Sequence, residues 1–413
     1  MTSPKPTTSP VKKPRDVRVD FFRGAALIII FVAHVPGNVL GDWIPARFGL
    51  SDAAHMFVFI SGYAAAIAFG GTFLRFGFLA GAGRIAIRCA QLFGAHIGLF
   101  IAVATLCAVF ADQLGGLEYA AHLNIGGFFA EPGHALTGLF TLSYVPTFFD
   151  ILPLYMVVLA LVPVATLLAR LHPYLPMTVS AVVWLAVQVQ GYALPAGYAE
   201  NALWGFNPFA WQLIFFTGYS LSMGWIARPS FSRPLVTLAA IYVAVSAAAM
   251  IPLIYESAEL LAMLRDWVLA HASKPDLDIR QYLHFLALAL VVLALLEGRT
   301  QVLAGAWAKP FVKIGQQALV VFVSGMTLSH LGGMVMQTYG TDLPVQLLVN
   351  GVGFGALFAI AYVSAWVKNP PWKAKSAPRA GIAALPAAAP AGLSVSSDSS
   401  GLPETGALAA PRG

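Results

Sequence analysis

Apolar runs long enough to cross a membrane recur along the whole chain. A helix needs about 20 mostly apolar residues to span the hydrocarbon core of a bilayer. The pattern predicts about ten such helices, at residues 21–40, 54–73, 89–111, 148–169, 173–190, 208–227, 234–254, 281–297, 311–332 and 344–367. The fold class is therefore an all-α polytopic membrane protein. The segment 112–147 is either a loop or a short re-entrant or interfacial element.

The composition agrees with this assignment and removes several other classes of protein. Of the 413 residues, 58% are hydrophobic and only 10% are charged, whereas a soluble domain carries about 25% charged residues. So little charge excludes a single soluble domain, a disordered scaffold and a nucleic-acid-binding protein. We therefore expect the lipid bilayer to cover most of the protein surface.

The few charges are distributed unevenly along the chain. With the N-terminus placed in the cytoplasm, 20 of the 24 Lys and Arg fall on the cytoplasmic side, and 13 of the 18 Asp and Glu fall on or near the outer side. This asymmetry follows the positive-inside rule and predicts that both termini are cytoplasmic. We expect a basic tail at residues 1–18, a transmembrane domain at residues 19–367 and a disordered tail rich in Ala, Pro, Ser and Gly at residues 368–413.

Two ionisable residues of the first apolar run are candidates for chemistry. Arg23 and His34 lie 11 residues apart, which on a helix returns to within about 20° of the same face and separates them by about 16 Å. An arginine at the membrane interface is suited to phosphate groups, and a neutral imidazole is suited to general-base catalysis. The alternative is that His34 only forms a hydrogen bond to a neighbouring helix.

Several motifs resemble a known family of membrane enzymes. The run from Asp20 to His34 contains Asp-x-x-Arg-Gly with a histidine eleven residues after the arginine, and it resembles the first-helix signature of the acyltransferase-3 superfamily. Residues 57–63 are similar to the Phe-rich Ser-Gly motif of that superfamily's second helix. Three further stretches resemble one family in particular, the OpgC family, which succinylates osmoregulated periplasmic glucans. They are residues 88–96, 150–155 and 207–212. The resemblance extends from residue 16 to residue 367.

The resemblance implies an O-acyltransferase of the bacterial inner membrane. Its donor would be cytoplasmic acyl-CoA, with succinyl-CoA expected, and its acceptor a hydroxyl of a periplasmic glucan or another glycan. His34 matches the family's catalytic histidine, and Arg23 matches the arginine that partners it on the CoA side. A basic CoA-binding pair corresponds to Arg84 and Arg88, although these are spaced one residue wider than usual. The alternative for that pair is ordinary positive-inside anchoring.

Further candidates lie on the outer side of the membrane. Asp150 either orients His34 or binds an acceptor hydroxyl as a third catalytic group, unless it only complements a helix dipole. The superfamily often has an acid six residues before the second-helix serine, but this chain has His55 there, with Asp52 one turn earlier. We expect this pair to bind the acceptor, together with Trp211, Gln212 and His330; helix packing is the alternative for all of these residues.

A different class of function, a proton-coupled transporter of a small or sugar-linked substrate, is also compatible with membrane-embedded histidines. No inverted repeat with matching broken helices supports this alternative. The sequence contains no zinc motif, so no metal is expected, and acyl-CoA is the only cofactor-like molecule. Whether His34 acts as a general base or carries the acyl group is not decided by the sequence.

Overall fold

The structure is a computed structural model that describes residues 16–197, 202–257, 259–370 and 372. The described residues form helices and no β-strand, which confirms the predicted all-α class. The chain divides into two units, Met1–Lys368 and Asn369–Gly413, and the first is the one considered below. The two predicted tails lie almost entirely outside the described residues.

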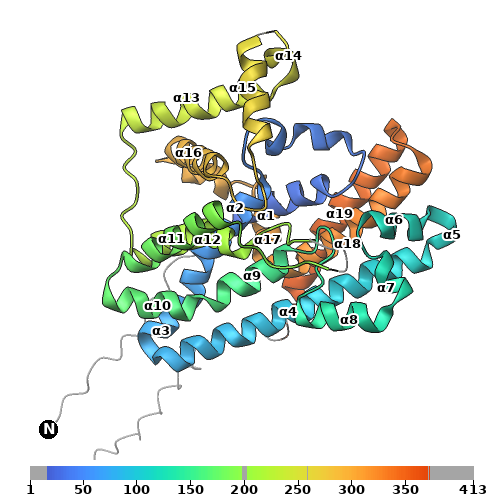
Figure 1. The fold of residues 1–413 in the computed structure, drawn as a ribbon, viewed down its shortest axis with the longest axis horizontal. Helices are drawn as coiled ribbons and strands as arrows, with labels where there is room; N and C mark the ends of the chain where they lie inside the picture. The colour runs from blue at the N-terminus through green and yellow to red at the C-terminus, as the bar shows by residue number, and fades with distance from the viewer. Residues whose placement is uncertain (1–15, 198–201, 258, 371, 373–413) are drawn as a thin grey trace, which may run out of the picture. The chain divides into compact units, whose positions relative to one another are not determined.

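The helices follow one another through short connections (Figure 1). The first part of the chain contains α1 (Val17–Ala33), the short 3-10 helices η1 (Val39–Trp43) and η2 (Pro45–Arg47), α2 (Ala53–Ala65), the π-helical η3 (Ala66–Gly70), α3 (Gly71–Phe76), α4 (Phe78–Val109), α5 (Ala111–Leu114), α6 (Gly116–His122), α7 (Gly126–Ala130), α8 (Pro132–Thr141), α9 (Ile151–Ala160) and α10 (Val162–Leu171). The remainder contains α11 (Leu175–Gln190), α12 (Pro208–Met223), α13 (Arg233–Met250), α14 (Pro252–Tyr255), α15 (Glu259–Ala270), α16 (Ile279–Leu296), η4 (Thr300–Ala304), α17 (Lys309–Gln316), α18 (Ala318–Tyr339) and α19 (Leu343–Lys368).

Seven of the described helical segments are long and apolar enough to cross a membrane, namely Ala53–Phe76, Phe78–Val109, Ile151–Leu171, Arg233–Met250, Ile279–Leu296, Ala318–Tyr339 and Leu343–Lys368. Helices α1, α11 and α12 coincide with the other three predicted runs, but they have only 17, 16 and 16 residues. The multi-pass membrane character is therefore supported, whereas the count of about ten crossings and the cytoplasmic location of the termini stay predictions.

The first helix is shorter than its apolar run at the C-terminal end. Helix α1 ends at Ala33, and His34 is its C-cap. Pro36 explains this end, because a proline disfavours helical geometry at the residue before it and cannot donate a backbone hydrogen bond. His34 is thus at a helix terminus and not inside a continuous span over residues 21–40.

Two helix pairs are held unusually close by glycine. A Cβ atom added to Gly24 of α1 would lie 1.9 Å from the carbonyl oxygen of Phe311 in α17, and one added to Gly62 of α2 would lie 2.0 Å from that of Phe215 in α12. Close backbone approach through small residues is the usual way in which membrane helices associate. Gly24 directly follows Arg23, so this contact fixes the arginine's place in the bundle.

The segment 112–147 is neither a plain loop nor a single re-entrant element. Most of it forms the short helices α5 to α8, which gather around the C-terminal end of α4 (Figure 1). Tyr144 Oη donates to the carbonyl oxygen of Asn124 at 2.6 Å and so ties the last part of this segment to the turn between α6 and α7. The chain that leaves it leads directly to Asp150 and α9.

Candidate functional site

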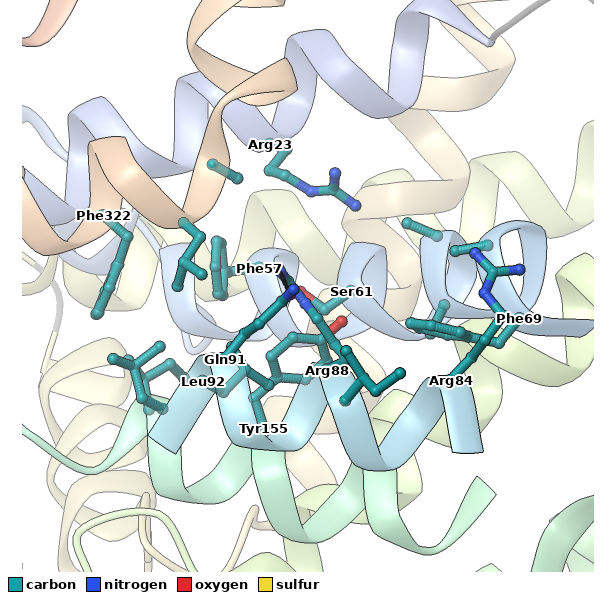
Figure 2. A pocket seen from close by; sticks show the side chains of 18 residues that line it. Arg23, Phe57, Ser61, Phe69, Arg84, Arg88, Gln91, Leu92, Tyr155 and Phe322 are labelled. Carbon is teal, nitrogen blue, oxygen red and sulfur yellow. Dashed lines mark hydrogen bonds between the residues drawn. The ribbon is translucent and has the colours of Figure 1, made fainter. Parts of the chain in front are cut away.

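A cavity of about 470 Å³ lies between helices α1, α2, α4, α9 and α18. It brings together the three arginines that the sequence analysis assigned to the donor, Arg23, Arg84 and Arg88. Figure 2 shows Arg84 beside Phe69 at one end, Phe322 at the other, and Arg23 and Arg88 between them. No Asp or Glu is among the described residues that line it. The described lining therefore carries three positive charges and no negative one, which favours an anionic ligand.

The arginines are held by neutral groups in the cavity wall. Arg84 donates to the hydroxyl of Thr72, and its guanidinium lies 5.5 Å from the ring centre of Phe69. Arg88 Nη1 donates to Gln91 Oε1 at 3.1 Å. Such contacts orient the guanidinium groups and leave further N–H donors for a ligand, since each arginine has five.

Tyr155 of α9 is a functional candidate that the sequence analysis did not single out. Its hydroxyl interacts with Arg88, and both Arg88 and Arg23 act on it electrostatically. Arg23 also donates a long hydrogen bond of 3.5 Å to the carbonyl oxygen of Ile60. Ser61, the serine of the motif at residues 57–63, lines the same cavity. Only the helix arrangement reveals these neighbours, since they come from α1, α2, α4 and α9.

The end of the cavity opposite Arg84 is apolar. Phe57 and Phe322 pack there with ring centres 6.0 Å apart, next to Leu92 and Leu152. His34 does not line the cavity; it lies about 16 Å farther along α1 than Arg23. The predicted donor residues and the predicted catalytic histidine therefore occupy separate places in the structure.

His34 sits at the end of α1 with one ring nitrogen engaged. Its Nδ1 is 2.7 Å from the carbonyl oxygen of Ile30. The ring of Phe148 meets the imidazole edge-on, with centres 5.0 Å apart and an angle of 84°. The charges of Asp52 and Lys274 also act on His34. The histidine is thus bordered by an aromatic ring and lies within electrostatic range of an ion pair.

His330 of α18 belongs to the same neighbourhood as His34, with which it interacts electrostatically. It is fully buried, and Tyr119 Oη lies 3.3 Å from its Nδ1. The ring of Phe149 lies nearly parallel to it at 6.0 Å. Its Nε2 has no hydrogen-bond partner within the described part of the chain.

Asp52 and His55 form the pair expected from their spacing. Asp52 Oδ1 lies 2.9 Å from His55 Nδ1, and the two residues make a capping box at the start of α2. Lys274, 222 residues away, donates to Asp52 Oδ2 at 2.6 Å. Burial alone would raise the pKa of Asp52, but the hydrogen bond from His55 and the Lys274 ammonium hold that pKa well below its usual range. Lys274 had no signal in the sequence beyond being a basic residue in an outer loop.

Trp211 and Gln212 are adjacent in sequence but have different surroundings. The indole of Trp211 lies 4.8 Å from the His55 ring, and its N–H donates to the carbonyl oxygens of Lys274 and Pro275. Gln212 accepts from Ser180 Oγ at 2.5 Å and donates to the Ser180 carbonyl oxygen at 2.7 Å. Trp211 thus supports the Asp52–His55 pair, whereas the amide of Gln212 is already occupied by helix α11.

Asp150 lies directly before α9 and is 7% exposed. Its carboxylate accepts a hydrogen bond from the backbone of Gly205. A Cβ atom at residue 205 would lie 2.6 Å from Asp150 Oδ2, so only glycine permits this approach. The carboxylate is anchored to the segment before α12, two positions from Phe148.

No group of three or more His, Cys, Asp or Glu side chains with metal-binding proximity occurs in the part of the chain that the structure describes. The arrangement offers instead a cationic cavity and, apart from it, a cluster of histidines, acids and aromatic rings around His34.

Comparisons with known proteins give one match. A family model described as "OpgC protein" matches residues 15–369, which is more than half of the 413 residues. No curated protein and no solved structure matches the chain.

Proposed function

Since the chain belongs to the OpgC family, we propose that it moves an acyl group, expected to be succinyl, from cytoplasmic acyl-CoA to a hydroxyl of a periplasmic glucan. Family membership indicates an acyltransferase that acts on glucans and resides in a membrane. The donor, the acyl group, the inner-membrane location and the residue roles below belong to the proposal.

The observation that carries the proposal is the cavity with three guanidinium groups and no carboxylate in its described lining. Coenzyme A carries several phosphate oxygens, and arginine binds these through short charge-assisted hydrogen bonds. Arg84, at the end nearest the predicted cytoplasmic side, and Arg88 would hold the phosphates. Arg23, deeper in the same cavity, would hold the polar part of the arm that leads to the thioester.

His34 would carry the chemistry on the outer side. Its Nε2 takes the proton of a glucan hydroxyl while the oxygen attacks the thioester carbon. The C–O bond of the ester forms, the C–S bond breaks, and CoA leaves as a thiolate that receives the proton. In the alternative route, Nε2 attacks the thioester carbon, the C–S bond breaks and CoA leaves as a thiolate. The glucan hydroxyl then attacks the acyl-imidazole, the N–C bond breaks, and the hydroxyl proton passes to the thiolate.

The groups around His34 suit an acceptor site. Asp52 and Lys274 form an ion pair beside His55, and the charges of this pair act on His34. Phe148 borders His34, and its neighbour Phe149 packs on His330. Asp150 directly follows Phe149 in the sequence. Sugar hydroxyls need such donors and acceptors, and a mostly apolar site with a few placed polar groups is typical of ligand binding.

In the proposed reaction, the thioester arm of the donor passes the apolar end of the cavity to reach His34. Phe57 and Phe322 form that end, and we expect their rings to move apart to admit the arm. The binding of CoA phosphates by Arg84 and Arg88 would supply the free energy for this opening, since binding energy from remote parts of a substrate can be used at the reacting centre.

The test uses the purified protein in lipid vesicles with radiolabelled succinyl-CoA and a glucan. We expect alkali-labile label on the glucan, and release of free CoA in equal amount. Movement of glucan or acyl-CoA across the membrane without ester formation would instead establish transport. Wild-type protein that forms no ester with any acyl-CoA would contradict the proposal.

A further inference from the structure

Phe148 has an unusual backbone conformation next to His34. Its φ angle is +72°, in the left-handed region that bulky residues rarely adopt because the Cβ atom crowds the backbone. The side chain is nevertheless 46% exposed, so burial in the core does not compensate for the strain. Strained residues of this kind cluster at functional sites, where the surrounding structure enforces them.

Both neighbours of Phe148 are fixed by the rest of the fold. Thr147 donates its backbone N–H to the carbonyl oxygen of Leu123 at 3.1 Å, and its hydroxyl accepts from Asn124 Nδ2 at 2.6 Å. On the other side, Phe149 is buried and lies parallel to His330. The backbone N–H of Phe149 donates to the carbonyl oxygen of Pro146 at 3.0 Å, so residues 146–149 form a turn in which Phe148 takes the positive φ angle.

The strained conformation directs the Phe148 ring to the predicted catalytic histidine. The ring meets His34 edge-on at 5.0 Å and lies 6.4 Å from His330. A side chain that only faced lipid would need no strained backbone, because exposed aromatic residues elsewhere in this protein, such as Phe140, lie on ordinary helices. The exposed part of the Phe148 ring is therefore an apolar surface immediately beside the imidazole.

We propose that Phe148 is a sugar-binding subsite, on which one pyranose ring of the acceptor packs so that its hydroxyl lies at His34. The axial C–H groups of a pyranose form an apolar face that matches an aromatic ring, and aromatic residues contribute large apolar contact area at low entropic cost. The inference rests on the proposed role of His34 in acyl transfer, but the binding itself requires no donor.

The test measures binding of a glucose oligosaccharide to the purified protein without acyl-CoA. We expect Phe148→Ala and Phe148→Leu to weaken binding about tenfold, the size of one lost aromatic contact, and Phe148→Trp to retain it. Phe140→Ala is the matched control, because that exposed phenylalanine packs on Phe93 and not on His34; its affinity should equal that of the wild type.

A second variant separates a binding role from a structural one. Glycine adopts positive φ freely, so Phe148→Gly should unfold at a temperature no lower than the wild type and still bind the oligosaccharide weakly. Unchanged affinity of the Ala and Gly variants, or a wild type that binds no oligosaccharide, would overturn the inference. Failure of acyl transfer with intact, Phe148-dependent binding would instead count against the proposed function alone.

Discussion

The carbonyl oxygen of Ile30 lies 2.7 Å from Nδ1 of His34, one helical turn away. A carbonyl oxygen only accepts hydrogen bonds, so Nδ1 is the donor and carries the proton of the neutral imidazole. The lone pair is then on Nε2. The end of α1 thus sets the tautomer of its own C-cap residue, without a carboxylate from another helix.

Removal of the His34 imidazole should abolish transfer while leaving the fold intact. We expect His34→Ala to lower kcat by about 10²–10⁴-fold, the usual contribution of a general base, with oligosaccharide binding and the unfolding temperature little changed. Transfer of label from acyl-CoA to glucan is the measurement. The control is His122→Ala, at an exposed position in the segment 112–147, which should behave as the wild type. Full activity of His34→Ala would rule out both catalytic routes.

Loss of cavity charge should affect the donor and not the acceptor. Arg23→Gln and Arg88→Gln should each raise KM for acyl-CoA by about tenfold, since one charge-assisted hydrogen bond contributes about 1.5–3 kcal/mol. Affinity for the glucan should be retained. Arg47→Gln, on an exposed outer 3-10 helix, serves as the control. If neither cavity substitution changed the KM for acyl-CoA, the assignment of Arg23 and Arg88 to donor binding would be wrong.

The ion pair between Asp52 and Lys274 should stabilise the fold at neutral pH, and this contribution should be lost only at acidic pH. The pKa of Asp52 is lowered in the fold, so its contribution to stability is present above the unfolded value of about 3.9 and is lost as the pH falls below it. The difference in unfolding temperature between wild type and Asp52→Asn should therefore be constant from about pH 8 to pH 5 and shrink below about pH 4. A difference that already shrinks between neutral pH and pH 5 would argue against the Asp52–His55–Lys274 arrangement.

The contact between α1 and α17 should tolerate no side chain at residue 24. A methyl group at Gly24 would overlap the Phe311 carbonyl oxygen, and such overpacking costs about 1–3 kcal/mol. We expect Gly24→Ala to lower the unfolding temperature and, by moving Arg23, to raise KM for acyl-CoA. Gly351→Ala on α19 has open space around it and should be neutral or stabilising. Equal behaviour of the two variants would show that the helices can separate without cost.

Much of the architecture is readable from the sequence because it depends on local properties. The length of each apolar run follows from the thickness of the bilayer, and each predicted run is mostly helical in the structure, although some runs contain two consecutive helices and the first extends beyond α1. Family membership follows from short motifs read in order. The convergence of Arg23, Arg84 and Arg88 is consistent with their shared position at the predicted cytoplasmic ends of their helices.

Other features depend on contacts between residues far apart in sequence, and only the tertiary structure decides them. Lys274 reaches Asp52 across 222 residues, and glycine contacts set the spacing of α1 against α17. The hydrophobic pattern of one helix contains no information on which helix packs beside it. For the same reason, the sequence determined that Arg23 and His34 share a helix. Only the packing of α2, α4, α9 and α18 decided that the arginine faces a cavity and the histidine a strained phenylalanine.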